Sequence, residues 1–136
     1  IGLIQLERYE ALLERRKGII KTYDRALRPL GVKSLQHYGE DYSSTGHLYL
    51  ARLPGIGETE RNEIIIRMAE AGIATNVHYK PLPMFTAYKK LGFDIKDYPN
   101  AFNMYKNEIT LPLHTLLSDE DVEYVIESFK RIINEV

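Results

Sequence analysis

The chain of 136 residues is long enough for one domain with a buried core, and its 44% hydrophobic and 27% charged residues are ordinary for a globular protein. A net charge of −1 gives no electrostatic reason to expect nucleic acid or an anionic membrane as a partner, and no run approaches the ~18 apolar residues of a membrane span. The sequence has no cysteine, which excludes disulfides, thiolate metal ligands and cysteine nucleophiles and is typical of a cytoplasmic protein.

The first 30 residues are predicted to form one long amphipathic helix. Its apolar side chains recur at three- and four-residue spacings, with one break at Arg16: Leu6, Tyr9, Leu13, Ile20, Tyr23, Leu27 and Leu30. Pro29 and Gly31 end the pattern, because proline cannot continue a helix and glycine is favoured just after one. The chain begins with Ile1 rather than Met and is already inside this pattern, so we expect it to be a fragment with an N-terminal part upstream.

The middle of the chain is predicted to contain two strands and a helix. The strands are expected at Leu35–Tyr38 and His47–Leu53, around a polar loop that contains glycine. In the second strand, alternate residues are expected on opposite faces: Tyr49, Ala51 and Leu53 on one, and Leu48, Leu50 and Arg52 on the other. A helix from Glu60 to Ala71 follows, with Thr59 as its N-cap.

The stretch from Gly72 to Pro83 carries the strongest functional signal in the sequence. Gly72 is predicted to adopt the left-handed conformation that ends the preceding helix, and Ile73–Val77 alternates apolar and polar residues as a half-buried strand does. An imidazole, a phenol and an ammonium group then follow in succession: His78, Tyr79 and Lys80. Prolines at positions 81 and 83 stop the strand. The pattern predicts a ligand site; the alternative is a strand-end histidine that bonds a backbone carbonyl.

The last third of the chain is predicted to contain two short helices, a strand and a longer helix. The short helices are expected at Met84–Leu91 and from Pro99 to about Asn107, and the strand at Glu108–Leu111. The final helix is expected to begin after Ser118, whose hydroxyl caps it. These elements predict an α+β fold, an α/β sandwich in which helices pack against a small, mostly antiparallel sheet.

No motif identifies an active site by itself. The histidines are His37, His47, His78 and His114. None is paired with another at metal-ligand spacing, so no metal site is predicted. The sequence also lacks a nucleophile elbow and a glycine-rich phosphate loop. The basic run Arg15-Arg16-Lys17 is interpreted as a solvated helix face, with contact to a phosphate or a partner chain as the alternative.

Four spaced motifs of this chain resemble the C-terminal domain of DegT/DnrJ/StrS sugar aminotransferases. They are Gly72-Ile73 with His78-Tyr79 and Pro81, Tyr98-Pro99-Asn100-Ala101, Leu111-Pro112-Leu113-His114, and Ser118-Asp119-Glu120-Asp121-Val122 with Val125-Ile126. Residues 1–8, with Arg15-Arg16 and Tyr23, resemble the family's long helix between its large and small domains. The resemblance covers essentially the whole chain. It implies an interdomain helix at residues 1–30, the small domain of a pyridoxal-phosphate-dependent transferase fold at residues 31–136, and a large cofactor-binding domain upstream.

The resemblance implies amino transfer from glutamate to a nucleotide-linked keto sugar through pyridoxal 5'-phosphate (PLP), for polysaccharide or glycoconjugate synthesis. A related sugar dehydratase on the same scaffold is the close alternative. The Schiff-base lysine would lie upstream of this chain, so we expect no catalytic residue, no retained cofactor and no activity from the chain alone. The parent enzyme is expected to be a cytoplasmic homodimer.

The resemblance also implies that His78, Tyr79 and Lys80 bind substrate where the small domain faces the active-site cleft. Many family members have a second histidine shortly after the first, and this chain has Pro83 at that position. Any polar role of the second histidine is therefore absent or moved. His114, after Leu-Pro-Leu, is interpreted as a turn residue.

Two other classes of function stay open. A free-standing ligand-binding or regulatory module would begin near Ile1 and fold as a monomer without exposed apolar surface. An interaction domain would dock its first helix on a partner, and removal of residues 1–12 would abolish binding while leaving the fold intact.

Overall fold

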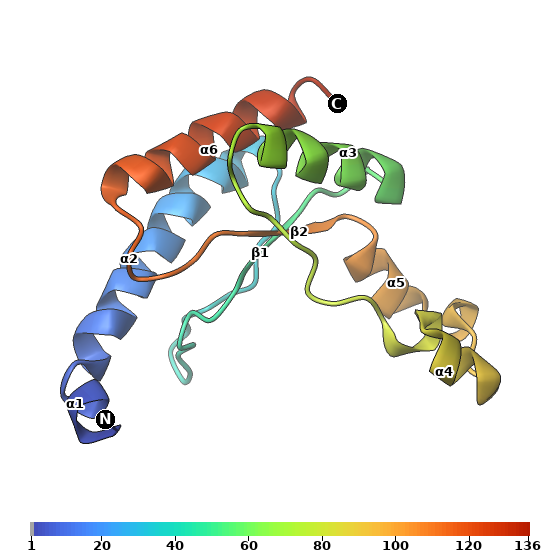
Figure 1. Ribbon diagram of the computed structural model, residues 1–136, viewed down its shortest axis with the longest axis horizontal. Helices are drawn as coiled ribbons and strands as arrows, with labels where there is room; N and C mark the ends of the chain where they lie inside the picture. Colours follow the sequence, from blue (N-terminus) through green and yellow to red (C-terminus); the bar gives the residue numbers. More distant parts are fainter. Residues whose placement is uncertain (1) are drawn as a thin grey trace.

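A layer of helices covers one face of a small antiparallel sheet (Figure 1). The computed structural model describes residues 2–136. Its helices are α1 (Gly2–Glu7), α2 (Tyr9–Leu27), α3 (Glu58–Glu70), α4 (Thr86–Lys90), α5 (Pro99–Tyr105) and α6 (Asp119–Ile133); its strands are β1 (Tyr49–Arg52) and β2 (Glu108–Leu111); and 3₁₀ turns lie at Arg28–Leu30, Leu82–Met84 and Ile95–Asp97. Helices α2, α3 and α6 form the covering layer (Figure 1). The predicted α+β fold with a small antiparallel sheet is confirmed.

The two strands pair so that one face of the sheet is apolar. Tyr49 lies opposite Leu111, and Arg52 lies opposite Glu108. Because side chains alternate along a strand, every second residue points toward the helices. Those side chains are at most 1% exposed: Tyr49, Ala51, Ile109 and Leu111. The predicted assignment of Tyr49, Ala51 and Leu53 to a common face is confirmed, and the structure shows that this face is the buried one.

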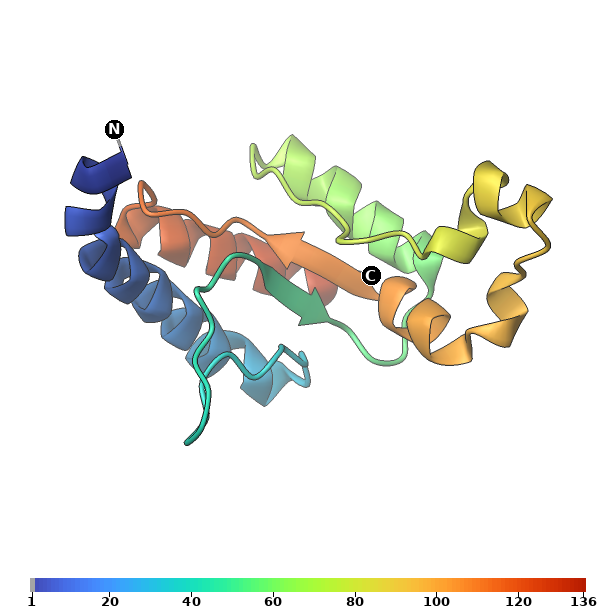
Figure 2. The ribbon, with the colours of Figure 1, turned by 90° about the horizontal axis from the view of Figure 1, so that it is seen from below.

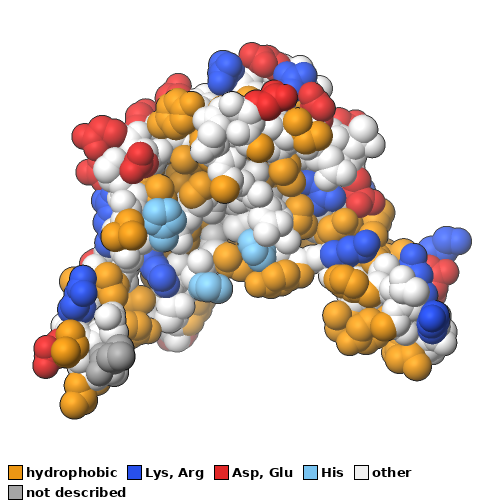
Figure 3. All heavy atoms as spheres, viewed as in Figure 1, with side chains coloured by type: hydrophobic (Ala, Val, Ile, Leu, Met, Phe, Trp, Pro, Cys, Tyr) orange, Lys and Arg blue, Asp and Glu red, His pale blue; other side chains and the backbone are white. Residues whose placement is uncertain are grey.

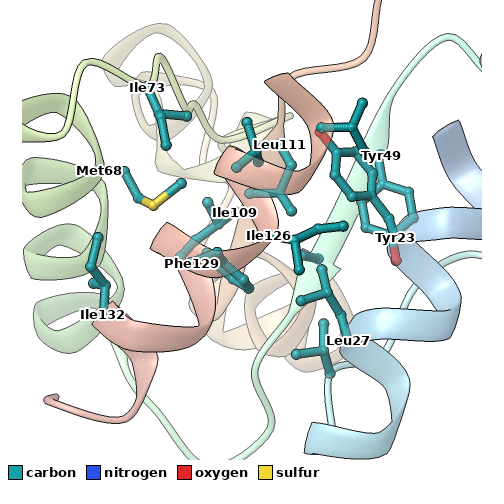
Figure 4. Close-up of a cluster of buried hydrophobic side chains, with 14 of the residues drawn as sticks. Tyr23, Leu27, Tyr49, Met68, Ile73, Ile109, Leu111, Ile126, Phe129 and Ile132 are labelled. Atoms are coloured by element: carbon teal, nitrogen blue, oxygen red, sulfur yellow. The ribbon is translucent and has the colours of Figure 1, made fainter. Parts of the chain in front are cut away.

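The core lies between this face and the helices (Figure 4). Phe129 of α6 and Met68 of α3 are 0% exposed. Tyr23 of α2 is also fully buried, and its hydroxyl donates a hydrogen bond to the Pro112 carbonyl oxygen at 2.8 Å. Burial raises the pKa of Tyr23 above its ordinary value. The tyrosine therefore joins α2 to the end of β2 by both packing and a hydrogen bond.

The ends of the helices follow ordinary capping chemistry. The Ser118 hydroxyl accepts from the Asp121 N–H at 3.0 Å and the Asp121 carboxylate accepts from the Ser118 N–H at 2.9 Å, so the predicted cap of the last helix is confirmed. Gly72 has φ 74°, in the left-handed region predicted for it. The prediction of Thr59 as a cap is wrong. Helix α3 begins two residues earlier than expected, and the Gly57 N–H donates to the Glu60 carboxylate at 3.1 Å.

The first helix is interrupted at Arg8, where α1 ends and α2 begins. The predicted end near Pro29 is correct, because α2 runs to Leu27 and continues as a 3₁₀ turn. The apolar stripe is buried only in its second half, from Ile19 onward. Leu3, Ile4 and Leu6 are 80%, 60% and 68% exposed, so this end of the stripe has no cover within residues 2–136.

Two predicted strands do not form. The chain near residues 35–38 pairs with residues 42–44 instead, because the Ser44 N–H donates to the His37 carbonyl and the Gly39 N–H to the Tyr42 carbonyl. Residues 73–77 make a single bridge, in which Asn76 and Thr110 exchange backbone hydrogen bonds. The Asn76 side chain then accepts from the Val77 N–H at 2.8 Å. This local hydrogen bond competes with a strand ladder, which alternation alone did not reveal.

Candidate functional site

The second face of the sheet lies outside the layer formed by α2, α3 and α6. Figure 2, seen from below, shows β1 and β2 in front of α6, with this face toward the viewer. Leu50 and Arg52 of β1 and Glu108 and Thr110 of β2 alternate with the core residues and therefore belong to this face. We call these four side chains the open face. Figure 3 shows the molecule hollowed below the sheet, between two projecting lobes that carry hydrophobic side chains.

A cavity of about 200 Å³ lies against the open face. His78 and Glu108 line it together with apolar side chains, which include Leu50, Pro81 and Met104. A mostly apolar cavity with a few polar groups is the usual form of a small-molecule site. The predicted ligand-site histidine thus lies at a cavity, although it follows an irregular segment rather than a strand.

Hydrogen bonds attach His78 to β2 at two points. The His78 N–H donates to Glu108 Oε2 at 2.9 Å, and the imidazole Nδ1 lies 2.8 Å from Thr110 Oγ1. The Thr110 hydroxyl in turn donates to Glu108 Oε1 at 2.5 Å. The alternative in which the histidine bonds a backbone carbonyl is not what the structure has, because both partners are side chains of β2.

Glu108 is a buried carboxylate at the centre of this network. It is 4% exposed, and burial raises its pKa above the ordinary value. The hydrogen bonds from Thr110 and from the His78 N–H, and the charge of Arg61, act in the opposite direction. Arg61 is itself 2% exposed, and its Nη1 donates to the Tyr105 carbonyl at 3.1 Å. The carboxylate is therefore largely buried and is supplied with hydrogen-bond donors.

Tyr79 and Lys80 have different surroundings. Tyr79 lines the same cavity, is 71% exposed, and places its ring edge-on to the His78 imidazole with centroids 4.6 Å apart. The peptide bond between His78 and Tyr79 is cis. Lys80 is exposed and does not line the cavity; its Nζ lies 5.5 Å from the centroid of the Phe85 ring. The structure thus brings together two of the three predicted site residues.

Sequence reasoning missed the residues of β2 that hold His78. Glu108 and Thr110 were assigned only to a short strand, although a charged and a hydroxyl side chain two positions apart lie on one face of it. The available signal was the glutamate inside the predicted strand, because a carboxylate is seldom buried unless it has a partner. His114 is exposed, and its carbonyl accepts from the Leu117 N–H in a turn, in line with the turn role predicted for it.

Other kinds of site have little support within residues 2–136. No group of three or more histidine, aspartate or glutamate side chains there is arranged to hold a metal ion. No helix in this range is long and apolar enough to cross a membrane.

The residues of this chain do not fit PLP as a complete site. That cofactor needs a lysine enclosed in a pocket, and no lysine of the chain is buried or lines the His78 cavity. Lys80, the nearest in sequence to His78, is exposed. No step of a reaction is therefore assigned to a lysine of this chain.

Comparison with known proteins gives consistent relatives. The sequence model of the DegT/DnrJ/EryC1/StrS aminotransferase family matches residues 1–130. The spore coat polysaccharide biosynthesis protein SpsC of Bacillus subtilis is 32% identical over 136 residues, covering 98% of this chain and 35% of that protein. A UDP-4-amino-4,6-dideoxy-N-acetyl-beta-L-altrosamine transaminase of Campylobacter jejuni is 32% identical over 136 residues, covering 100% of this chain and 36% of that protein.

Among solved structures, Spr1654 of Streptococcus pneumoniae, assigned as a sugar aminotransferase, is 53% identical with a TM-score of 0.95. The match covers 98% of this chain and 34% of that one, and Spr1654 has been solved in PLP and PMP forms. This chain thus spans about a third of the length of the relatives that it matches. The fold is that of the small domain of PLP-dependent aminotransferases. The chain belongs to the DegT/DnrJ/EryC1/StrS aminotransferase family.

Proposed function

We propose that this chain is the small domain of an enzyme that uses PLP to transfer an amino group from glutamate to a nucleotide-linked keto sugar. The observation that carries the proposal is the family match over residues 1–130, together with the His78 cavity on the open face. In this proposal residues 1–30 are the interdomain helix and residues 31–136 are the small domain. The anchoring lysine and the rest of the cofactor site belong to a large domain encoded upstream.

The chain's own role is to bind and orient the sugar substrate at one wall of the cleft. His78 provides a polar contact, and the exposed ring of Tyr79 offers an apolar surface against which a sugar ring packs. Lys80 is exposed beside them and provides a positive charge for a phosphate of the nucleotide. Fixing the substrate in this way lowers the entropic cost of bringing its keto carbon to the cofactor.

The exposed apolar side chains of α1 are assigned to contacts with other parts of the enzyme. Leu3, Ile4 and Leu6 lie next to one another on a short helix that makes few contacts with the rest of the described chain. A free-standing module would leave this surface in water, which soluble monomers seldom do. In the proposal these residues pack on the large domain or on the second subunit of a cytoplasmic homodimer.

The test is an amino-transfer assay on the protein encoded by the complete reading frame. With glutamate and a panel of keto sugars linked to UDP, dTDP or GDP, we expect an amino sugar and 2-oxoglutarate in equal amounts. The 136-residue chain alone should give neither product, and borohydride should trap no stoichiometric PLP adduct on it. A reading frame that starts at Ile1, or a stoichiometric adduct on the isolated chain, would contradict the proposal. Loss of a sugar hydroxyl without amino transfer would indicate the related dehydratase.

A further inference from the structure

Three side chains are joined by hydrogen bonds on the open face, beside the cavity. This network starts at Glu108, which is 4% exposed, passes through Thr110, which is 6% exposed, and ends at the half-buried His78. The distances are 2.5 Å from Thr110 Oγ1 to Glu108 Oε1 and 2.8 Å from Thr110 Oγ1 to His78 Nδ1. No hydrogen bond within residues 2–136 uses His78 Nε2.

With Glu108 ionised, the count of hydrogens in this network assigns the tautomer of a neutral His78. Glu108 accepts at both oxygens, from the His78 N–H at Oε2 and from the Thr110 hydroxyl at Oε1. A threonine hydroxyl has a single hydrogen, so once it is donated to Glu108 the oxygen can only accept. The partner at 2.8 Å must then be an Nδ1–H. A neutral imidazole with hydrogen on Nδ1 carries its lone pair on Nε2.

Resting on the function proposed above, we propose that Glu108 and Thr110 are positioning residues that keep hydrogen on His78 Nδ1, so that Nε2 accepts a hydrogen bond from a hydroxyl or N–H group of the substrate. A lone pair repels a carboxylate and attracts a hydroxyl, so the site selects the sugar rather than the carboxylates of glutamate. The apolar lining of the cavity suits the carbon face of a sugar ring.

The same count of hydrogens predicts how a substitution reverses the direction of these hydrogen bonds. In Glu108→Gln the side-chain carbonyl must face the His78 N–H, because that backbone group can only donate. The new NH₂ group then faces Thr110 Oγ1, and the threonine hydroxyl turns to donate to Nδ1. His78 consequently carries hydrogen on Nε2. This substitution changes an acceptor into a donor with almost no change of shape.

The test uses diethyl pyrocarbonate, which acylates an accessible imidazole nitrogen through its lone pair, on the full-length protein at one pH near neutral. Peptide mass spectrometry gives the rate at each histidine. In Glu108→Gln we expect the rate at His78 to fall about tenfold, the equivalent of one hydrogen bond. Exposed His47 and His114 serve as internal controls and should keep their rates, and buried His37 should stay protected if the variant is folded.

Two further variants at Thr110 separate a specific role from a general one. Thr110→Ser keeps the hydroxyl and should keep the wild-type rate at His78. Thr110→Val removes it and should lower that rate, so the proposal stays testable if Glu108→Gln does not fold. An unchanged rate at His78 in both Glu108→Gln and Thr110→Val would overturn the proposal.

Free glutamate tests whether His78 binds a carboxylate instead of a hydroxyl or N–H group. It should leave the rate at His78 unchanged in the wild-type protein, and protection by glutamate would overturn the acceptor role. These results do not depend on turnover. A protein that shows the predicted labelling but transfers no amino group would contradict the proposed function and leave the positioning roles standing.

Discussion

The two faces of the β1–β2 sheet differ although their residues alternate along the same four-residue strands. One face consists of Tyr49, Ala51, Ile109 and Leu111, all fully buried under helices. The open face carries Arg52, which donates to Asn107 Oδ1, and Glu108 and Thr110, which bond to each other and to His78. The first face determines whether the chain folds, whereas the second buries polar groups at a cost that stability alone does not explain. Such a cost is typical of a site.

The largest expected effect comes from the core face. Phe129 of α6 is 0% exposed and packs over the apolar side of the sheet (Figure 4). Phe129→Ala should lower the free energy of unfolding by about 3–5 kcal/mol, because it removes buried area and leaves a cavity. Urea unfolding measures this. Leu116→Ala is the matched control, since Leu116 is 88% exposed. A loss from Phe129→Ala no larger than that of the control would contradict the assignment of the core.

A smaller loss is expected where the core face meets the end of β2. Tyr23→Phe keeps the ring and removes the hydroxyl that donates to the Pro112 carbonyl. The carbonyl loses its partner, so the free energy of unfolding should fall by about 1–3 kcal/mol. The same urea experiment measures the change. An unchanged midpoint would show that water replaces the hydroxyl.

Buried His37 should make the protein less stable as the pH drops. His37 is 6% exposed, and burial lowers its pKa below the ordinary value of 6.5. The unfolded chain therefore binds a proton at a higher pH than the folded one, so stability falls as the pH drops below about 6.5. His37→Gln should flatten this slope, and His47→Gln, at an exposed position, should not. Urea midpoints on both sides of this pH give the slope.

Glu108, the buried carboxylate of the open face, should give stability the opposite dependence on pH. The folded pKa of Glu108 is raised above 4.5, so the stability it contributes is complete below that pH and is lost as the pH rises through the folded pKa. Glu108→Gln should remove this loss. Because groups from Arg61, Thr110 and His78 oppose the effect of burial, we expect this to be the smallest of the four changes. A variant that steepens the loss would show that the hydrogen bonds outweigh burial.

Much of the fold was predictable from the sequence because it rests on local chemistry. The strand at Glu108–Leu111, the helix start at Ser118 and the helix end at Gly72 each depend on residues close in sequence, and all three predictions hold. The prediction of a strand at residues 73–77 is wrong, because the structure of this segment does not depend on local chemistry alone. In this segment the Val77 N–H donates to the Asn76 side chain, and the single backbone bridge of Asn76 depends on the position of β2.

The candidate site could be predicted only in part for the same reason. His78 was conspicuous in sequence because it follows a glycine-closed helix and precedes two prolines. Its partners Glu108 and Thr110 lie 30 and 32 positions away, and the backbone bridge between Asn76 and Thr110 brings His78 to them. Tyr79 and Lys80 are adjacent in sequence, yet only Tyr79 reaches the cavity.

The most direct measurement of the central claim compares His78→Ala with His47→Ala in the full-length protein. If the open face binds the sugar substrate, His78→Ala should lower kcat/KM for the keto sugar about 10- to 100-fold, since one substrate contact is lost. Its urea midpoint should stay close to that of the wild type, and His47→Ala should change neither quantity. Equal kinetics for His78→Ala and the wild type would contradict the claim that the open face is the substrate wall.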